Sequence, residues 1–227
     1  MEILAYAVVA VVAYLIGSVP TGYLAARAKG IDIRTVGSGN IGATNAFRIL
    51  GTVPGALVLV ADALKGSVAV VFLGLAGPLV AQTPAGQVDQ AAAQFQVAAG
   101  IAAILGHSYT CWLGFKGGKG VATTAGVFLT LMPWALLAAL GVWLVGLLVS
   151  RYVSVASILA AVALPVATWT LPLPAWQRDN RMMLFWVALA LGSLVIYRHR
   201  GNIRRLLDGT ESRLGTKKPA AEKGGAV

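Results

Sequence analysis

The sequence predicts an all-α integral membrane protein of about seven transmembrane helices, with the N-terminus outside and the C-terminus in the cytoplasm. Three observations carry this prediction. Hydrophobic residues make up 58% of the 227 residues, charged residues make up only 11%, and the mean hydropathy is +0.78. A soluble domain carries roughly 25% charged residues. A chain this apolar buries its side chains in lipid as well as in a protein core, so one helical bundle is expected.

Several apolar stretches are long enough to cross a bilayer, since spanning the hydrocarbon core takes about 20 mostly apolar helical residues. These stretches are 3–26, 53–80, 91–113, 121–150, 153–173 and 182–197. The first stretch follows Met1-Glu2, has no positively charged region before it and is too long for a signal peptide. It is therefore predicted to be the first span.

The distribution of lysine and arginine predicts which loops share a side, because short cytoplasmic loops are enriched in these residues. The loop 27–52 carries four of them, the loop 114–120 carries two and the segment from Arg198 onward carries eight, whereas the loop 81–90 carries none. The loops 27–52 and 114–120 and the segment from Arg198 onward are therefore expected in the cytoplasm, with the N-terminus outside. That arrangement requires an odd number of spans.

Six apolar stretches give an even number of spans, so one of them must contain two spans. The stretch 121–150 is the candidate, because it is unusually long and contains Met132-Pro133 near its middle. Proline removes a backbone donor and often marks a break in a helix. The stretch is therefore predicted to form a hairpin of two short helices, which returns Arg151 to the cytoplasm. The alternative is one long tilted helix, which would place the basic tail outside.

Residues 1–207 are predicted to form one transmembrane helical domain. Residues 208–227 are polar and aperiodic, which predicts a disordered cytoplasmic tail. The net charge of +10 lies at the ends of apolar stretches and in this tail, which argues against nucleic acid and favours membrane lipids or an anionic substrate as partners. The single cysteine, Cys111, excludes an intramolecular disulfide and carries no zinc pattern.

The first polar loop has the composition of an anion site. It reads Gly37-Ser38-Gly39-Asn40-Ile41-Gly42-Ala43-Thr44-Asn45 and is followed by Arg48. Glycines let backbone N–H groups converge on an anion, the serine and asparagines add neutral hydrogen-bonding groups, and the arginine adds a fork suited to phosphate. The pattern is formally GxGxxG, but its flanks are membrane helices and not a βαβ unit, so dinucleotide binding is rejected. A polar turn that caps a helix is the alternative interpretation.

A second loop, Phe115-Lys116-Gly117-Gly118-Lys119-Gly120, leads directly into an apolar stretch. It is not a Walker A motif, since Gly120 stands where serine or threonine is required. Two lysines among three glycines at a helix start nevertheless suit a phosphate. The alternative is a basic turn that obeys the positive-inside rule, which fits Lys116 better than Lys119.

Ionisable and polar residues at membrane depth are functional candidates, because they are costly in lipid. Asp62 and Lys65 are three residues apart on a helix and are predicted to form an ion pair; alternatively, Lys65 points into a cytoplasmic site. His107 is either a satisfied core group or a catalyst. Ser154 is either a ligand or a helix cap, and Asn202 is either a ligand or part of a solvated surface. Paired carboxylates, metal-ligand clusters and nucleophile motifs are absent from the sequence, so neither a metal nor a cofactor is expected.

Under the seven-span topology these loops all fall on the cytoplasmic face, which predicts a site for phosphorylated substrates at the inner membrane surface. A transporter or exchanger of a phosphorylated solute is the rival hypothesis. It fits the basic loops and the charges within a span. The small size, the lack of evident repeats and the gathering of polar motifs on one face argue against it.

Taken together, these motifs resemble the bacterial acyl-phosphate:glycerol-3-phosphate acyltransferases, the PlsY family. The matching segments are 37–45 with Arg48, 62–66, 106–107, 113–123, 152–157, and His199 with 202–203 and 209–211. The departures are Thr110-Cys111, where a proline is usual, and Gly201, where a charged residue is common.

The resemblance implies transfer of a fatty acyl group from acyl phosphate to the sn-1 hydroxyl of glycerol 3-phosphate. The products would be lysophosphatidic acid and inorganic phosphate, in the first acylation step of phospholipid synthesis. It also implies a multi-pass protein of the bacterial inner membrane, an active site facing the cytoplasm, no cofactor, and a soluble acyl-phosphate-producing enzyme as a partner.

The resemblance also implies roles for individual residues. Ser38, His107 and Lys119 are the expected catalytic residues. The expected substrate-binding residues are Ser38, Asn40, Asn45, Arg48, Lys65, His107, Lys116, Lys119, Ser154 and Asn202. Of these, Arg48, Lys119 and Ser154 are assigned to the phosphate of glycerol 3-phosphate. The acyl phosphate and its oxyanion are assigned to Ser38, Asn40, Lys65 and His107, with Asn202 closing the site. The acceptor of the hydroxyl proton stays open between His107 and a phosphate oxygen of the substrate.

Overall fold

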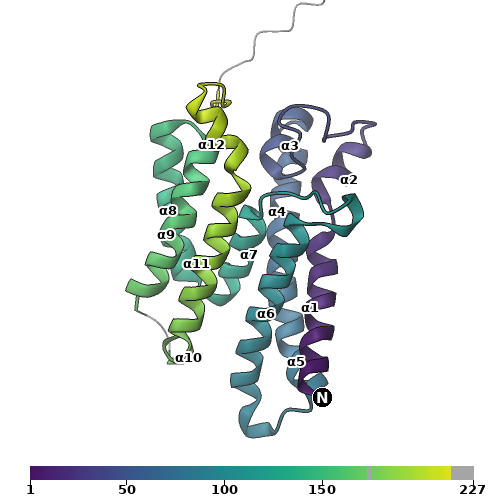
Figure 1. Ribbon diagram of the computed structural model, residues 1–227, viewed down its shortest axis with the longest axis vertical. Coiled ribbons are helices and arrows are strands. Elements are labelled where there is room, and N and C mark those ends of the chain that lie inside the picture. Colours follow the sequence, from purple (N-terminus) through teal and green to yellow (C-terminus); the bar gives the residue numbers. More distant parts are fainter. Residues whose placement is uncertain (173–174, 216–227) are drawn as a thin grey trace, which may run out of the picture.

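The computed structural model describes residues 1–172 and 175–215, without the side chains of 175 and 176, and every regular element in these ranges is a helix (Figure 1). The first half of the chain forms α1 (Glu2–Ser18), α2 (Thr21–Arg27), α3 (Ala43–Leu50), α4 (Thr52–Val68), a π-helical turn (Ala69–Leu73) and α5 (Gly74–Ala81). After a 3-10 turn (Ala85–Gln87) and α6 (Val88–Ser108), a second 3-10 turn (Cys111–Leu113) precedes the glycine-rich loop. The second half then forms α7 (Val121–Leu131), α8 (Pro133–Ser150), α9 (Val153–Thr170), α10 (Ala175–Asp179), α11 (Arg181–Arg198) and α12 (Arg200–Leu207).

Six helical segments of the described chain are long and apolar enough to cross a membrane, which confirms the prediction of an all-α integral membrane protein. They are Glu2–Arg27, Thr52–Ala81, Ala85–Leu113, Pro133–Ser150, Val153–Thr170 and Arg181–Arg198. Helix α7 is also apolar but has only 11 residues. At 1.5 Å per residue such a helix is about 16 Å long, half of a hydrocarbon core of about 30 Å. The count of seven complete spans therefore stays a prediction.

The chain does break within the stretch 121–150, at Met132, whose φ of −151° and ψ of 70° are not helical. Pro133 then occupies the first turn of α8, where its missing N–H costs nothing. In Figure 1 α7 and α8 run in opposite directions, so the break reverses the chain. This agrees with the predicted hairpin, although α8 at 18 residues is longer than a short helix.

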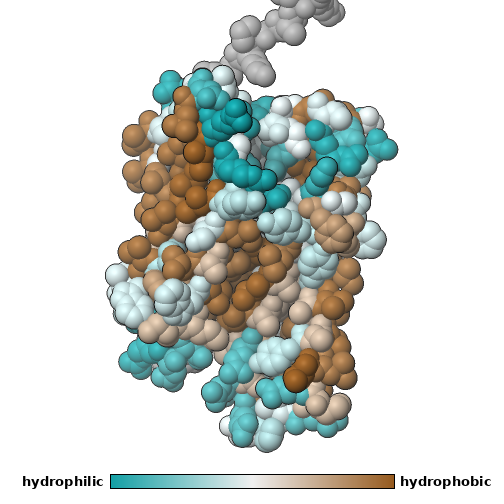
Figure 2. Space-filling model, in the orientation of Figure 1, coloured by the Kyte–Doolittle hydropathy of each residue, from teal (hydrophilic) through white to brown (hydrophobic). Residues whose placement is uncertain are grey.

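The polar connections gather at the two ends of the bundle. In Figure 1 the segment between α2 and α3, the segment between α6 and α7, and α12 lie at one end, while the N-terminus and α10 lie at the other. Figure 2 shows hydrophilic residues at both ends and hydrophobic residues between them. The loops that charge assigns to one side of the membrane therefore lie together, and their assignment to the cytoplasm stays a prediction.

Close helix packing holds the bundle together at small residues. A Cβ added to Gly17 in α1 would collide with the backbone of Ala103 in α6, and one added to Gly126 in α7 would collide with the backbone of Ala63 in α4. Helices in lipid associate through such close backbone approaches, because the surrounding lipid is as apolar as the side chains. The outer faces are correspondingly apolar and exposed, as at Leu148 and Val149.

The segment after α12 differs from the prediction of a disordered tail beginning at 208. Glu211 accepts hydrogen bonds from Ser154 and Asn202, and the Leu214 N–H donates to the Arg151 carbonyl over 2.7 Å. Polarity suggested a solvated tail, but these polar groups find partners on the bundle itself. The rest of the predicted tail, 216–227, and residue 173 at the predicted end of an apolar stretch lie outside the described residues.

Candidate active site

Three of the predicted site residues come together around one carboxylate. The Lys119 ammonium donates to Asn202 Oδ1 over 2.6 Å, and the Asn202 amide donates to Glu211 Oε1, also over 2.6 Å. Ser154 Oγ donates to the same Glu211 oxygen over 2.8 Å. Ser154 and Asn202 are buried. Three segments thus meet at one site: the glycine-rich loop, the start of α9 and the start of α12. Each contributes a hydrogen-bond donor of a kind that can bind an anion.

Cations surround this cluster. Arg205 of α12 binds Glu211 Oε2 over 2.7 Å. Burial on its own would raise the pKa of the Glu211 carboxyl, but hydrogen bonds from Asn202, Ser154 and Arg205 lower it below its usual value. The carboxylate is therefore held in its charged form.

Burial is the main cause that lowers the pKa of Lys119 to about 8; the charge of Glu211 opposes this shift, and the charges of Arg205, Arg198 and Arg48 contribute to it. Arg48 of α3 is thus near enough to Lys119 to act on its charge. This crowding of positive charge predicts strong attraction for a dianionic phosphate.

His199 lies at the start of α12 beside this cluster and is buried. Burial, followed by the charge of Lys119, lowers its pKa to about 4, and its Nδ1 lies 2.7 Å from the Val195 carbonyl oxygen. The imidazole is therefore neutral near pH 7, and its Nδ1 carries the proton that this contact requires.

The first polar loop is organised by Asn45, which is 1% exposed. Its side-chain oxygen accepts from the Ser38 N–H over 3.0 Å, and its amide donates to the carbonyls of Val36 and Asn40 over 3.1 and 3.0 Å. The hydrogen-bonding groups of Asn45 hold the loop in shape, and its expected contact with substrate stays a prediction. Ser38 and Arg48 remain exposed at the surface of this loop.

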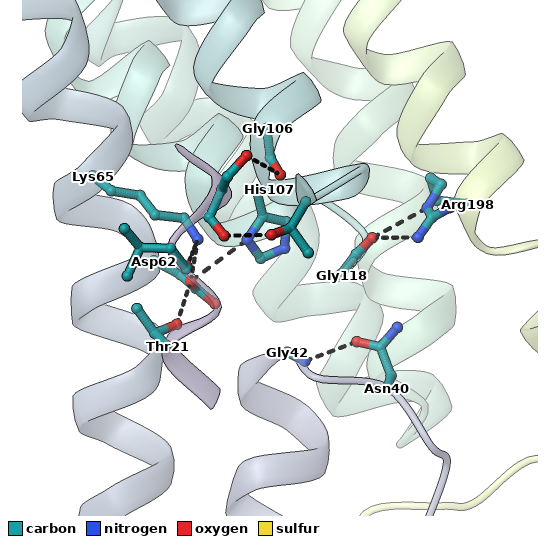
Figure 3. A network of polar contacts seen from close by, with 12 residues as sticks. Thr21, Asn40, Gly42, Asp62, Lys65, Gly106, His107, Gly118 and Arg198 are labelled. Carbon is teal, nitrogen blue, oxygen red and sulfur yellow. Dashed lines mark hydrogen bonds and ion pairs between the residues drawn. The ribbon is translucent and has the colours of Figure 1, made fainter. Parts of the chain in front are cut away.

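Asn40 has a mixed role. Its side-chain oxygen accepts the N–H of Gly42, the residue that precedes α3, over 2.9 Å. Its amide nitrogen is drawn pointing away from that contact in Figure 3. Asn40 therefore shapes the loop through its oxygen, while the side chain stays partly exposed.

The second loop is held at Gly117 and Gly118. The Gly117 N–H donates to the Ser108 carbonyl over 3.2 Å and the Gly118 N–H donates to the His107 carbonyl over 3.0 Å. These two N–H groups are therefore used within the protein. Lys116 in the same loop is exposed.

A second polar cluster is buried behind the loop (Figure 3). Asp62 Oδ1 accepts from Thr21 Oγ1 over 2.6 Å and lies 2.8 Å from the Lys65 ammonium, which confirms the predicted ion pair. Lys65 also donates to the Val19 carbonyl over 3.0 Å and is 8% exposed. Its donors point into the protein, so the structure places Lys65 as a partner of Asp62 and not at a substrate surface.

His107 joins the two clusters. Its Nδ1 lies 3.5 Å from Asp62 Oδ1, which is long for a hydrogen bond, and its Nε2 lies against Gly118, where a Cβ would collide with it. The ring is 5% exposed. The predicted catalytic histidine is thus enclosed between an ion pair and the glycine-rich loop, which gives it a supporting position.

Sequence reasoning missed three functional candidates. Glu211 was recognised only as part of a matching segment, Asp62 only as a partner of Lys65, and Arg198 only as one positive charge of the tail. Asp62 lies within an apolar segment and Arg198 at the end of one, and that signal alone marks a residue for inspection, whereas Glu211 lies in a polar segment that gave no such signal. Among residues 1–172 and 175–215 there is no group of three or more His, Cys, Asp and Glu side chains that could hold a metal ion.

Comparisons with known proteins point to one family. The family model described as glycerol-3-phosphate acyltransferase matches residues 7–209. A glycerol-3-phosphate acyltransferase of Geobacter sulfurreducens is 46% identical over 205 residues, which cover 89% of this chain and 94% of that protein. The enzyme of the same name from Geotalea daltonii is 45% identical over 203 residues, which cover 88% and 93%.

Solved structures agree. The crystal structure of PlsY (YgiH), an integral membrane glycerol 3-phosphate acyltransferase, in its glycerol 3-phosphate form has a TM-score of 0.77 and 39% identity, and the match covers 93% of this chain and 96% of that chain. Its lysophosphatidic acid form has a TM-score of 0.75 and 38% identity over the same shares.

Proposed function

This chain belongs to the glycerol-3-phosphate acyltransferase family and is an integral-membrane acyltransferase, and we propose that it moves a fatty acyl group from acyl phosphate to the sn-1 hydroxyl of glycerol 3-phosphate. The products are lysophosphatidic acid and inorganic phosphate. The proposal places this reaction first in the acylation sequence of phospholipid synthesis.

One observation carries the choice of site. Ser154 and Asn202 come from distant segments and both donate to the negatively charged carboxylate of Glu211, and Lys119, from a third segment, donates to the side-chain oxygen of the same Asn202. An ammonium, a hydroxyl and an amide are the donor types that also hold a phosphate. We assign the phosphate of glycerol 3-phosphate to this group together with Arg48, and the acyl phosphate to the exposed face of the first loop at Ser38 and Asn40.

The chemistry that remains for the protein is mainly positional. Acyl phosphate is already activated, so the glycerol hydroxyl oxygen attacks the acyl carbon, the bond from that carbon to the phosphate oxygen breaks, and inorganic phosphate leaves. Holding both reactants in line supplies much of the rate enhancement, and fixed cations stabilise the charge that develops. Because the His107 ring is enclosed, we favour a phosphate oxygen of the substrate as the acceptor of the hydroxyl proton.

We further propose that the site faces the cytoplasm of a bacterial inner membrane. The charge distribution supports this, because the loops around the site carry most of the lysine and arginine. A cytoplasmic site also suits a phosphorylated, soluble acceptor and an acyl donor that a soluble enzyme supplies.

The test uses purified protein in detergent or lipid mesophase. Phosphate release from palmitoyl phosphate is followed with and without glycerol 3-phosphate, and palmitoyl-CoA serves as the competing donor. The proposal predicts release that depends on glycerol 3-phosphate, no reaction of the CoA ester, and loss of turnover in Lys119→Ala but not in the control Arg200→Ala, which removes an exposed cation.

Two results would contradict the proposal. Turnover with palmitoyl-CoA at the rate of palmitoyl phosphate would overturn the choice of donor. A folded protein that binds glycerol 3-phosphate but turns over neither donor would favour the exchanger hypothesis, which flux of labelled glycerol 3-phosphate into proteoliposomes then tests.

A further inference from the structure

Arg198, the last residue of α11, binds the glycine-rich loop from outside. Its Nη2 donates to the Gly117 carbonyl over 2.8 Å. Its Nη2 and Nε also donate to the Gly118 carbonyl, over 2.8 and 3.1 Å (Figure 3). The guanidinium carbon also lies 5.0 Å from the centre of the Tyr109 ring. One side chain thus satisfies two consecutive carbonyls while an aromatic face supports it.

The opposite edge of the same loop is held by α6. The N–H groups of Gly117 and Gly118 donate to the carbonyls of Ser108 and His107, as described above. The His107 ring fills the space where a side chain at Gly118 would lie. The N–H groups and the carbonyl groups of both glycines are therefore hydrogen-bonded. The bonds to the two carbonyls come from Arg198.

These contacts close a ring that includes Lys119. Gly118 precedes Lys119 in the chain, and Arg198 precedes Asn202 by four residues. Arg198 joins Gly118, and Lys119 joins Asn202 over 2.6 Å. The end of α11 and the start of α12 are thus connected to the glycine loop at one point each, and this two-point attachment fixes the direction in which the Lys119 side chain leaves the loop.

We propose that Arg198 is a positioning residue that sets the place of Lys119 for the phosphate of glycerol 3-phosphate. The inference rests on the proposed function, because it concerns how the protein binds the phosphate of glycerol 3-phosphate. Arginine suits the task through its planar fork, which donates to two carbonyls at once, whereas the ammonium of a lysine is a single compact charge. Shape, and not charge alone, is therefore the property that Arg198 contributes.

The test compares the wild type with Arg198→Lys, Arg198→Ala and the control Arg200→Ala. Arg200 lies two residues further along, is exposed and contacts only its neighbour Tyr197 in the interactions recorded for it. Steady-state assays measure kcat and the KM for each substrate, and thermal unfolding reports folding. Arg198→Lys and Arg198→Ala are expected to raise the KM for glycerol 3-phosphate by about tenfold or more, because charge-assisted hydrogen bonds are lost. The KM for palmitoyl phosphate is expected to stay within about twofold, and Arg200→Ala is expected to behave as the wild type.

The lysine variant decides the question, since it keeps the charge and most of the length of the side chain. A wild-type KM in Arg198→Lys would show that charge suffices and would overturn the proposal. Equal increases in the KM of both substrates, or lower stability with unchanged KM values, would show a general structural role and would also overturn it.

Binding separates this inference from the proposed function. The shift of the unfolding midpoint with added glycerol 3-phosphate compares the wild type with Arg198→Lys without any turnover. Weaker binding by the variant supports the positioning role even if the wild type does not transfer an acyl group, a result that contradicts the proposed function alone. Equal binding by an active wild type and the variant contradicts the positioning role alone.

Discussion

Lys119 and Asn202 lie 83 residues apart in the sequence, and the Lys119 ammonium donates to the side-chain oxygen of Asn202 over 2.6 Å. The same Asn202 donates through its nitrogen to Glu211. The amide nitrogen of Asn202 faces the Glu211 carboxylate, so the amide oxygen is the atom that faces Lys119. Lys119, Asn202 and Glu211 therefore form a chain of hydrogen bonds, and a substitution of one residue also changes the hydrogen bonding of its neighbour in the chain.

The first prediction concerns the pH dependence of Lys119. Its pKa is about 8 in the folded protein against the usual 10.5, so its charge is lost within an accessible pH range. We expect kcat/KM for glycerol 3-phosphate to fall above about pH 8, because the phosphate loses a cationic partner. A pH profile of the wild type measures this, and Arg200→Ala, which removes an exposed cation, serves as the control that keeps the same profile.

The same shift affects stability, with a sign that follows from linkage. Between about pH 8 and 10.5 the unfolded chain keeps the Lys119 proton while the folded protein has released it, so stability contributed by this group rises with pH in that window. Lys119→Met should abolish this rise in the unfolding midpoint. An identical pH profile of stability in the variant would contradict the assignment.

The second prediction concerns Glu211. Glu211→Gln is expected to lower the free energy of unfolding by about 1–3 kcal/mol, because Arg205 loses its ion pair and the new amide nitrogen faces donors. Since the folded-state pKa of Glu211 is lowered, its contribution is present above the unfolded pKa and disappears as the pH falls through the folded value. Thermal unfolding from pH 7 downward checks both statements, with Glu2→Gln as the control. A variant as stable as the wild type throughout would refute them.

The third prediction concerns the contact of α7 with α4. Gly126→Ala is expected to cost about 1–3 kcal/mol of stability, because the new Cβ collides with the Ala63 carbonyl and the helices must separate. Gly141→Ala in α8 is the matched control, since a Cβ there meets open space and alanine favours the helix. Comparison of the unfolding midpoints tests the difference, and equal midpoints would show that the helices do not pack this closely.

The fourth prediction separates two roles of Lys65. Asp62→Leu is expected to destabilise the protein by about 3–5 kcal/mol, because the ammonium of Lys65 stays buried without its carboxylate. The double variant Asp62→Leu with Lys65→Met should recover most of that stability, since both charges are removed together.

Activity of the double variant then decides the role. Retained turnover is expected, because the structure turns Lys65 toward Asp62 and Val19. A stable but inactive double variant would instead support the expectation from the sequence that Lys65 binds acyl phosphate.

Features that depend on neighbouring residues were readable from the sequence. Apolar length identified the membrane helices, Pro133 marked the break between α7 and α8, and the spacing of three residues predicted the pair of Asp62 with Lys65. The resemblance of the motifs led to the family that the comparisons confirm. Lipid makes such reading possible, because every span must satisfy its own backbone hydrogen bonds and present apolar side chains over a set length.

Features that depend on how distant segments meet were not readable. Asn45 and Ser38 stand in the same motif, yet one is buried as the organiser of the loop and the other is exposed. Glu211 follows a polar helix in a segment that composition assigns to the tail, yet it accepts a hydrogen bond from Ser154, which lies 57 residues away in the sequence.

The sequence by itself determined the class of protein, the membrane helices, the charge asymmetry of the loops and the family, because each is encoded in local composition and order. Only the tertiary structure decided that Ser154 and Asn202 donate to one carboxylate while Lys119 donates to Asn202, that His107 is enclosed, and that Arg198 holds the glycine loop. The physical reason is that a hydrogen bond acts over about 3 Å. The packing of helices far apart in the sequence determines which donors and acceptors come within that reach.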